Sequence, residues 1–157
     1  QTGSICEISS GYIVLRDRNH LVFTKKIKEF DTSVIIEKIG NHKIGRYKFS
    51  IKEVSRQEMK FSQDKFTEYI DADFMNPYFE IRNKKEGDIF LPLGAPGEMK
   101  LSDFLTNSKV SLIDKSNILI LTNKIDILWV IGHRISDKCK VTKETKKILQ
   151  LKFINTD

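Results

Sequence analysis

The sequence has little of several features that commonly signal function. Its 157 residues include two cysteines, three prolines and one tryptophan. Cys6 and Cys139 are far apart in the sequence and match no metal-ligand spacing, so we expect two free thiols in a reducing compartment rather than a disulfide. The longest apolar run, residues 125–132, is too short to span a membrane and is interrupted by Asp126. These absences favour a cytoplasmic protein with no membrane partner.

Catalytic patterns are also missing. No Ser/His/Asp or Cys/His arrangement is suggested, and there is neither a Walker loop nor a dinucleotide fingerprint. Asp71 and Asp73 would share one face of a strand and could attract a metal, but no other carboxylate or histidine is near, so we interpret them as a structural turn. The histidines fall in separate turns without paired carboxylates, and we interpret each as a surface residue: His20, His42 and His133. We therefore expect no catalytic residue, metal or cofactor in this chain.

The chain does have a globular composition and a clustered positive charge. Hydrophobic residues make up 39% and charged residues 31%, and ten phenylalanines argue against disorder. The net charge is +6, and residues 133–152 alone carry seven Lys and Arg against Asp137 and Glu144. Such a cluster favours a polyanion partner, with solvated surface lysines as the alternative. The chain begins at Gln1 without an initiator Met or a signal peptide, which suggests a fragment of a longer protein.

Alternating apolar residues predict a fold that is mostly antiparallel β, with one or two short helices in the C-terminal half. A hairpin is expected at residues 4–16, with its turn at Ser9-Ser10-Gly11. Further strands are expected at residues 21–23, 33–37, 47–54, 68–72, 117–121, 127–131 and 146–154. A turn is expected at 41–45, a loop at 132–137, a helix of about two turns at 100–107 and another helical turn at 112–115. Asn76-Pro77 is the best boundary, and it separates a β-rich accessory region (1–76) from a second domain (77–157).

Residues 81–105 form the most distinctive stretch, with two of the three prolines and three of the eight glycines. The pattern indicates a basic strand end, a Gly-Asp turn, a short apolar strand, a Gly/Pro loop and the start of an amphipathic helix. Its glycines and prolines must shape the loop, because such a loop cannot hydrogen-bond to itself regularly. Basic residues at its edges could hold a phosphate backbone, while a plain strand–helix connection is the alternative.

This stretch and the one that begins at Trp129 resemble the C-terminal domain of bacterial tRNA(Ile)-lysidine synthetases. The first group of matching residues is Arg82, Gly87, Asp88, Phe90, Pro92, Leu93, Gly94, Gly97, Lys100, Leu101, Asp103 and Phe104. The second group is Trp129, Val130, Gly132, Arg134, Ile135, Lys140, Val141, Thr142, Thr145 and Lys146. Residues 2–23 also look like the segment that follows the catalytic part in this family. The resemblance implies an α+β fold with a sandwich-like sheet, which agrees with the strands expected from the sequence. The chain departs from the family's frequent Arg, Pro, Arg and Lys at Lys84, Glu86, Ile89 and Met99.

The resemblance implies a parent enzyme that uses ATP, with Mg, to adenylate the wobble cytidine of tRNA(Ile) and to ligate lysine to its C2 atom. The Ser-Gly-Gly-x-Asp-Ser loop that binds ATP in such enzymes is absent here. The resemblance therefore implies a non-catalytic part, inactive alone, that binds tRNA(Ile) at its acceptor stem and adjoins its own N-terminal catalytic domain. The alternative is a structural or homodimerisation module that orients the catalytic domain without contacting RNA.

Two sets of candidate residues follow from the charge pattern and the resemblance. The tRNA-binding candidates are basic residues at the edges of the 81–105 stretch and in the segment after Trp129: Arg82, Lys84, Lys85, Lys100, Arg134, Lys138, Lys140, Lys143 and Lys146. The candidates for shaping the fold are Gly87, Asp88, Phe90, Pro92, Gly94 and Gly97.

Overall fold

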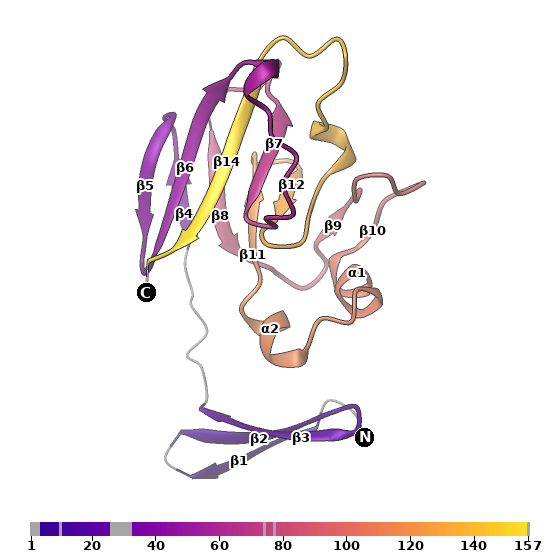
Figure 1. Ribbon diagram of the computed structural model, residues 1–157. Coiled ribbons are helices and arrows are strands. Elements are labelled where there is room, and N and C mark those ends of the chain that lie inside the picture. The colour runs from indigo at the N-terminus through magenta and orange to yellow at the C-terminus, as the bar shows by residue number, and fades with distance from the viewer. Residues whose placement is uncertain (1–3, 10, 26–32, 74, 77, 157) are drawn as a thin grey trace.

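A computed structural model of the chain describes residues 4–9, 11–25, 33–73, 75–76 and 78–156. Antiparallel strands dominate, and two short helices lie in the C-terminal half, which confirms the predicted fold class (Figure 1). Ser10, in the first predicted turn, and Pro77, at the predicted boundary, lie outside the described residues. Within the described part of the chain, no helix has the length and apolar character needed to cross a bilayer.

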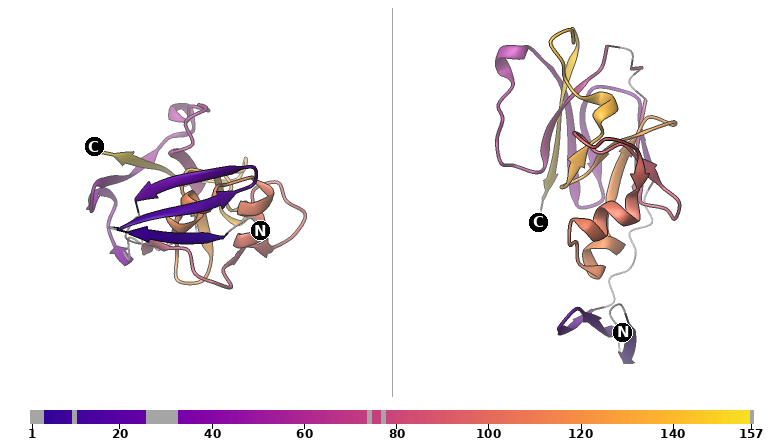
Figure 2. Two further views of the ribbon diagram at one scale, coloured as in Figure 1. Left: turned by 90° about the horizontal axis from the view of Figure 1, so that it is seen from below. Right: turned by 90° about the vertical axis from the view of Figure 1, so that its right-hand side faces the viewer.

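The N-terminal strands form a sheet of their own, seen in Figure 2 as three adjacent ribbons. It consists of β1 (Ile5–Ser9), β2 (Tyr12–Asp17) and β3 (His20–Lys25). This arrangement confirms the predicted hairpin, and the strand predicted at residues 21–23 pairs with it as part of β3. Leu15 lies opposite Ile5 and Val22 in the register, and its side chain is buried.

Two larger antiparallel sheets make up the rest of the fold. The four-stranded sheet consists, in spatial order, of β5 (Gly40–Ile44), β6 (Tyr47–Val54), β14 (Ile148–Asn155) and β7 (Thr67–Asp71). The five-stranded sheet consists of β13 (Arg134–Ile135), β12 (Ile127–Val130), β11 (Leu119–Thr122), β8 (Phe79–Asn83) and β4 (Ser33–Ile36).

These two sheets pack face to face, as a sandwich-like prediction requires. One cluster of buried side chains includes Phe49 and Leu151 of the four-stranded sheet together with Ile81 and Trp129 of the five-stranded sheet. The side chain of Trp129 is fully buried, in agreement with a packing role. Every residue of β11 and β12 is buried, because the five-stranded sheet is covered on both faces.

The second face of the five-stranded sheet is covered by helix α1 (Leu101–Asn107) and the short ribbon of β9 (Ile89–Phe90) and β10 (Met99–Lys100). A second buried cluster joins Leu101 and Leu105 of α1 to apolar residues of β11 and β12. The apolar spacing that predicted an amphipathic helix thus marks the face that docks on the sheet. The remaining elements are α2 (Leu112–Ser116) and the 3-10 turns η1 (Arg56–Glu58) and η2 (Asp137–Cys139).

Strands from the two sides of residues 76–77 are interleaved. Strand β4 pairs with β8, and β14 pairs with both β6 and β7. The main buried cluster likewise takes residues from both sides of this point. The boundary predicted at Asn76-Pro77 therefore does not separate two cores, because long-range strand pairing overrides the local turn signal.

Two local predictions differ from the structure. Residues 41–45 were expected to be a turn, but most of them form β5, an edge strand whose only buried side chain is Ile44. An edge strand of this kind can be polar because much of it faces water. Residues 132–137 were expected to be a loop, and they include the short strand β13 and the start of η2.

Candidate nucleic-acid interface

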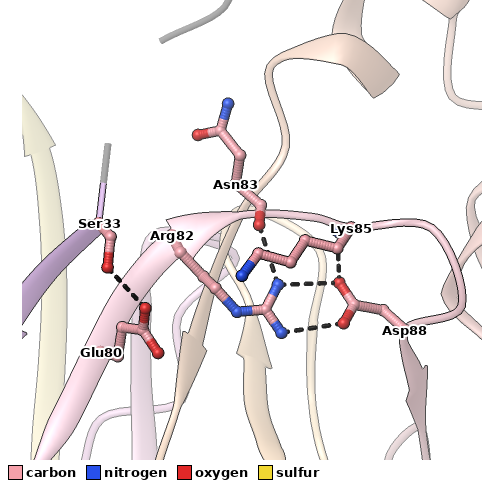
Figure 3. Close-up of polar contacts among 6 residues, drawn as sticks. All are labelled: Ser33, Glu80, Arg82, Asn83, Lys85 and Asp88. Atoms are coloured by element: carbon pink, nitrogen blue, oxygen red, sulfur yellow. Dashed lines mark hydrogen bonds and ion pairs between the residues drawn. The ribbon is translucent and has the colours of Figure 1, made fainter. Parts of the chain in front are cut away.

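The charge of Arg82 is held within the fold rather than presented to solvent (Figure 3). Its guanidinium donates from Nη1 to Oδ2 of Asp88 (3.0 Å) and from Nη2 to Oδ1 (2.9 Å). The two side chains are only 15% and 12% exposed. Burial raises the pKa of Asp88, but the hydrogen bonds from Arg82 and from the Lys85 amide outweigh this effect, so the pKa of Asp88 is lower than its ordinary value.

Asp88 also shapes the turn between β8 and β9. Gly87 has φ +84, a conformation that suits glycine, and the Lys85 amide donates to Oδ2 of Asp88 (2.6 Å). The carbonyl of Asp88 accepts from the amide of Leu101 (2.8 Å). Asp88 therefore links the segment that carries Lys85 to the start of α1, which directly follows Lys100.

Two segments that carry the family resemblance lie side by side and form what we call the loop pair, residues 91–98 and 132–140. Pro92 and Ser136, both buried, form an isolated antiparallel bridge. The bonds that accompany it run from Leu93 N to Ile135 O (3.0 Å), from Asp137 N to Leu91 O (2.8 Å) and from Gly94 N to Asp137 Oδ1 (3.1 Å). Segments about forty residues apart in the sequence thus make one surface.

Three of the predicted tRNA-binding residues lie on this loop pair. Arg134 is exposed, and its Nη1 donates to the carbonyl of Leu93 (3.3 Å). Lys140 Nζ lies 2.9 Å from Oδ2 of Asp137. The third, Lys138, makes two ion pairs on the same surface.

Lys138 is tied to carboxylates from two different segments. Its Nζ lies 2.7 Å from Oδ1 of Asp126 and 2.8 Å from Oε1 of Glu98. These hydrogen bonds, the one to Asp126 first, raise the pKa of Lys138 above its ordinary value. Exposed ion pairs of this kind contribute little to stability, so an RNA phosphate can compete for the lysine at small cost.

The remaining predicted lysines lie outside the loop pair. Within the described part of the chain, no ion pair is made by Lys84, Lys85, Lys100, Lys143 or Lys146. Lys84 is partly buried and the other four are exposed.

The loop that carries Lys143 is held by the two aspartates that were interpreted as a turn. Asp71 accepts from the hydroxyl of Thr145 (2.6 Å). Asp73 accepts from the amides of Lys146 and Lys147, and these bonds lower its pKa. In the described part of the chain, no group of three or more His, Cys, Asp or Glu side chains could hold a metal ion. Asp71 and Asp73 therefore stabilise the backbone before β14 through hydrogen bonds to residues 145–147.

A further group of basic residues lines a cleft that the sequence did not single out. This His133 cleft, of about 980 Å³, lies between the β5–β6 turn, the segment before β7, the α1–α2 connection and the turn after β12. Arg46, Lys65, Lys109 and His133 line it, with Asp114 opposing their charge. They come from separate segments, and the only sequence signal near them is the Gly132-to-Ile135 part of the family motif. His133 is partly buried, which its interpretation as a surface residue did not anticipate.

Comparisons with known proteins agree with this fold. No protein-family model matches the chain. A tRNA(Ile)-lysidine synthase of Parabacteroides distasonis is 31% identical over 148 residues, which cover 93% of this chain and 34% of the relative. The enzyme of the same name from Clostridium perfringens is 30% identical over 168 residues, which cover 97% of this chain and 35% of the relative.

A solved structure, the crystal structure of a TilS C-terminal domain, is similar in fold with a TM-score of 0.64 at 15% identity. It covers 80% of this chain and 99% of that one. The chain spans about a third of the length of the curated relatives it matches. The matches lie in the C-terminal part of these relatives. The chain belongs to the tRNA(Ile)-lysidine synthase family, to whose C-terminal part it corresponds.

Proposed function

We propose that this chain binds tRNA(Ile) for a cytoplasmic tRNA(Ile)-lysidine synthase. The attached catalytic domain would use ATP and Mg²⁺ to activate C2 of the wobble cytidine and ligate lysine there. This chain contributes no catalytic residue and would be inactive alone. Its part is to hold the tRNA, at the acceptor stem, while the chemistry proceeds elsewhere.

The observation that carries this proposal is the loop pair. It joins two motif segments into one surface and places Arg134, Lys138 and Lys140 on it. A-form RNA is held mainly through its shape, its phosphates and its 2′-hydroxyls, which suits a set of exposed cations more than a base-reading pocket. Lys85, Lys100, Lys143 and Lys146 supply further charge, whereas Arg82 is occupied by Asp88 and is a weaker candidate.

A salt titration tests the proposal. If about four phosphates are neutralised, the logarithm of tRNA affinity falls with the logarithm of salt concentration at a slope of about −3 to −4. Fluorescence anisotropy with labelled tRNA(Ile) at several salt concentrations measures this slope. A flat response would contradict phosphate binding and favour the alternative, a module that only orients or dimerises the catalytic domain.

A further inference from the structure

The His133 cleft contains an aromatic ring whose position is set by the backbone. Phe66 is 48% exposed, its amide donates to Oδ1 of Asp64 (3.0 Å), and its carbonyl accepts from the amide of Phe153 (2.9 Å). The ring edge lies against Gly132, where an added Cβ would come within 2.9 Å of Cε1 of Phe66. Gly132 also has φ +78, so any other residue there would be strained and would displace the ring.

A second ring and an apolar wall complete the cleft. Tyr47 packs on Phe153 with ring centroids 4.8 Å apart. The guanidinium of Arg46 lies 5.1 Å from the centroid of Tyr47 and donates to its hydroxyl (3.0 Å). Ile118 and Ile131 also line the cleft. The lining of the cleft therefore includes aromatic and aliphatic side chains.

The charge of the cleft is positive. Lys65 and Lys109 line it, and neither makes an ion pair within the described residues. Asp114 is the one carboxylate in the described lining, and it is engaged by the hydroxyl of Ser111 (2.7 Å). Burial lowers the pKa of His133, and Lys65 lowers it further. At neutral pH its imidazole is therefore an uncharged group that can donate or accept a hydrogen bond.

An exposed aromatic ring beside free cations is the combination that binds single-stranded nucleic acid, since a base stacks on the ring while the cations hold the backbone. A cleft of about 980 Å³ is within the range of about 300–1,000 Å³ typical of small-ligand sites. The cleft also adjoins the loop pair, because His133 immediately precedes Arg134. An RNA held on the loop pair can place an unpaired end or bulge here.

We propose that the His133 cleft binds one unpaired nucleotide of the RNA, with its base stacked on Phe66 and its phosphate near Lys65 and Lys109. The inference rests on the proposed RNA binding and adds to it a preference for RNA with an unpaired nucleotide next to a stem. A base-paired stem contacts the loop pair, and a single-stranded nucleotide next to that stem occupies the cleft. A paired base within the stem has no free face for Phe66.

The test compares three probes on the 157-residue chain by fluorescence anisotropy and competition. They are a blunt RNA duplex, the same duplex with three unpaired 3′ nucleotides, and adenosine monophosphate. The overhang duplex is expected to bind more tightly than the blunt one. Phe66→Ala is expected to weaken overhang binding by about 5- to 100-fold, the range for loss of one base stack, and to leave blunt-duplex binding unchanged.

Two further variants separate stacking from folding. Phe66→Trp retains a stacking surface and is expected to keep the preference for the overhang. Phe61→Ala removes a phenylalanine that is 92% exposed and outside the cleft, and it is expected to change the affinity for neither duplex. Melting curves establish that each variant is folded at the assay temperature.

The outcomes distinguish this inference from the proposed function. Equal affinity for the blunt and overhang duplexes, or no effect of Phe66→Ala on overhang binding, would overturn the inference about the cleft. If the duplexes still bound with the expected dependence on salt, the proposed function would stand. If adenosine monophosphate competed for the cleft as effectively as the overhang duplex, the result would overturn the inference that RNA occupies the cleft and would favour a free nucleotide as its ligand. Failure to bind any duplex would remove the proposed function and the inference with it.

Discussion

Arg82 and Asp88 show how one side-chain pair can decide the role of a motif residue. The two side chains are largely buried and form a bidentate ion pair. Such charge-assisted hydrogen bonds are stronger than hydrogen bonds between neutral groups. We expect Asp88→Asn to lower the free energy of unfolding by about 1–3 kcal/mol, because it leaves the guanidinium buried without its counter-charge. Urea unfolding measures the change. Glu86→Gln, at an exposed position in the same turn, is the control and should shift stability by less than about 0.5 kcal/mol.

The same carboxylate makes part of the stability sensitive to acid. Because the pKa of Asp88 is lower in the fold than in the unfolded chain, its contribution is fully present above the unfolded pKa. It is lost as the pH falls through the folded pKa. The stability gap between the native chain and Asp88→Asn should therefore narrow below about pH 4. A gap that stays constant down to pH 2 would contradict this assignment.

The two cysteines differ in reactivity. Cys139 is buried, its Sγ donates to the carbonyls of Ser136 (3.3 Å) and Leu128 (3.4 Å), and burial raises its pKa to about 12. Cys6 is exposed. Since the thiolate is the reactive form, iodoacetamide at pH 8 should modify Cys6 and spare Cys139 in the native protein. Mass spectrometry of peptides measures both, and unfolding in guanidinium chloride should make Cys139 react. Equal rates in the native state would contradict the buried position.

For individual residues, the sequence predicts which side chains are buried better than it predicts which groups a side chain contacts. The apolar spacing at residues 100–107 was enough to predict an amphipathic helix, since periodicity depends only on local geometry, and Leu101 and Leu105 of that helix are buried. The role of Arg82 was not predictable in the same way. Whether its side chain meets RNA or Asp88 depends on how the Gly87 turn folds back, and that requires the three-dimensional path of the backbone.

Among the elements, the loop pair carries the proposed interface. Its two segments belong to different parts of the five-stranded sheet region, and no local pattern indicates that they touch. Strand β5 was also not predictable from its own sequence, because its residues are typical of a turn and become a strand only through pairing with β6. Elements with their own periodicity, such as β6 and α1, were predictable, whereas those defined by their neighbours were not.

Charge reversal on the loop pair and at the nearby Lys143 should weaken RNA binding without unfolding the protein. We expect the triple variant Arg134→Glu, Lys140→Glu and Lys143→Glu in the intact enzyme to reduce tRNA(Ile) affinity by more than tenfold, because three phosphate-facing charges become repulsive. A variant with the same change of charge on the β5–β6 side, Lys38→Glu, Lys43→Glu and Lys48→Glu, is the control. Affinity is measured by filter binding and oligomeric state by light scattering. Unchanged affinity with an altered oligomeric state would support the structural alternative.

At the scale of the whole molecule, the four-stranded sheet depends on β14. Strands β6 and β7 do not pair with each other, and both pair with β14 along most of its length. We expect a chain that ends after Lys147 to lose its cooperative unfolding transition, because the sheet loses its central strand and Leu149, Leu151 and Phe153 leave the core. Circular dichroism during heating measures this. A chain that ends after Asn155 should keep the transition.

The position of β14 also bears on how the protein folds during synthesis. Strands β5, β6 and β7 leave the ribosome long before the strand that joins β6 to β7, so the four-stranded sheet stays unfinished until residues 148–155 have emerged. Pairings between distant parts of a chain form slowly, and unpaired strand edges attract other chains in the meantime. The nascent protein therefore has a long interval in which β6 and β7 lack their shared neighbour, and chaperones that shield open strand edges would matter most then.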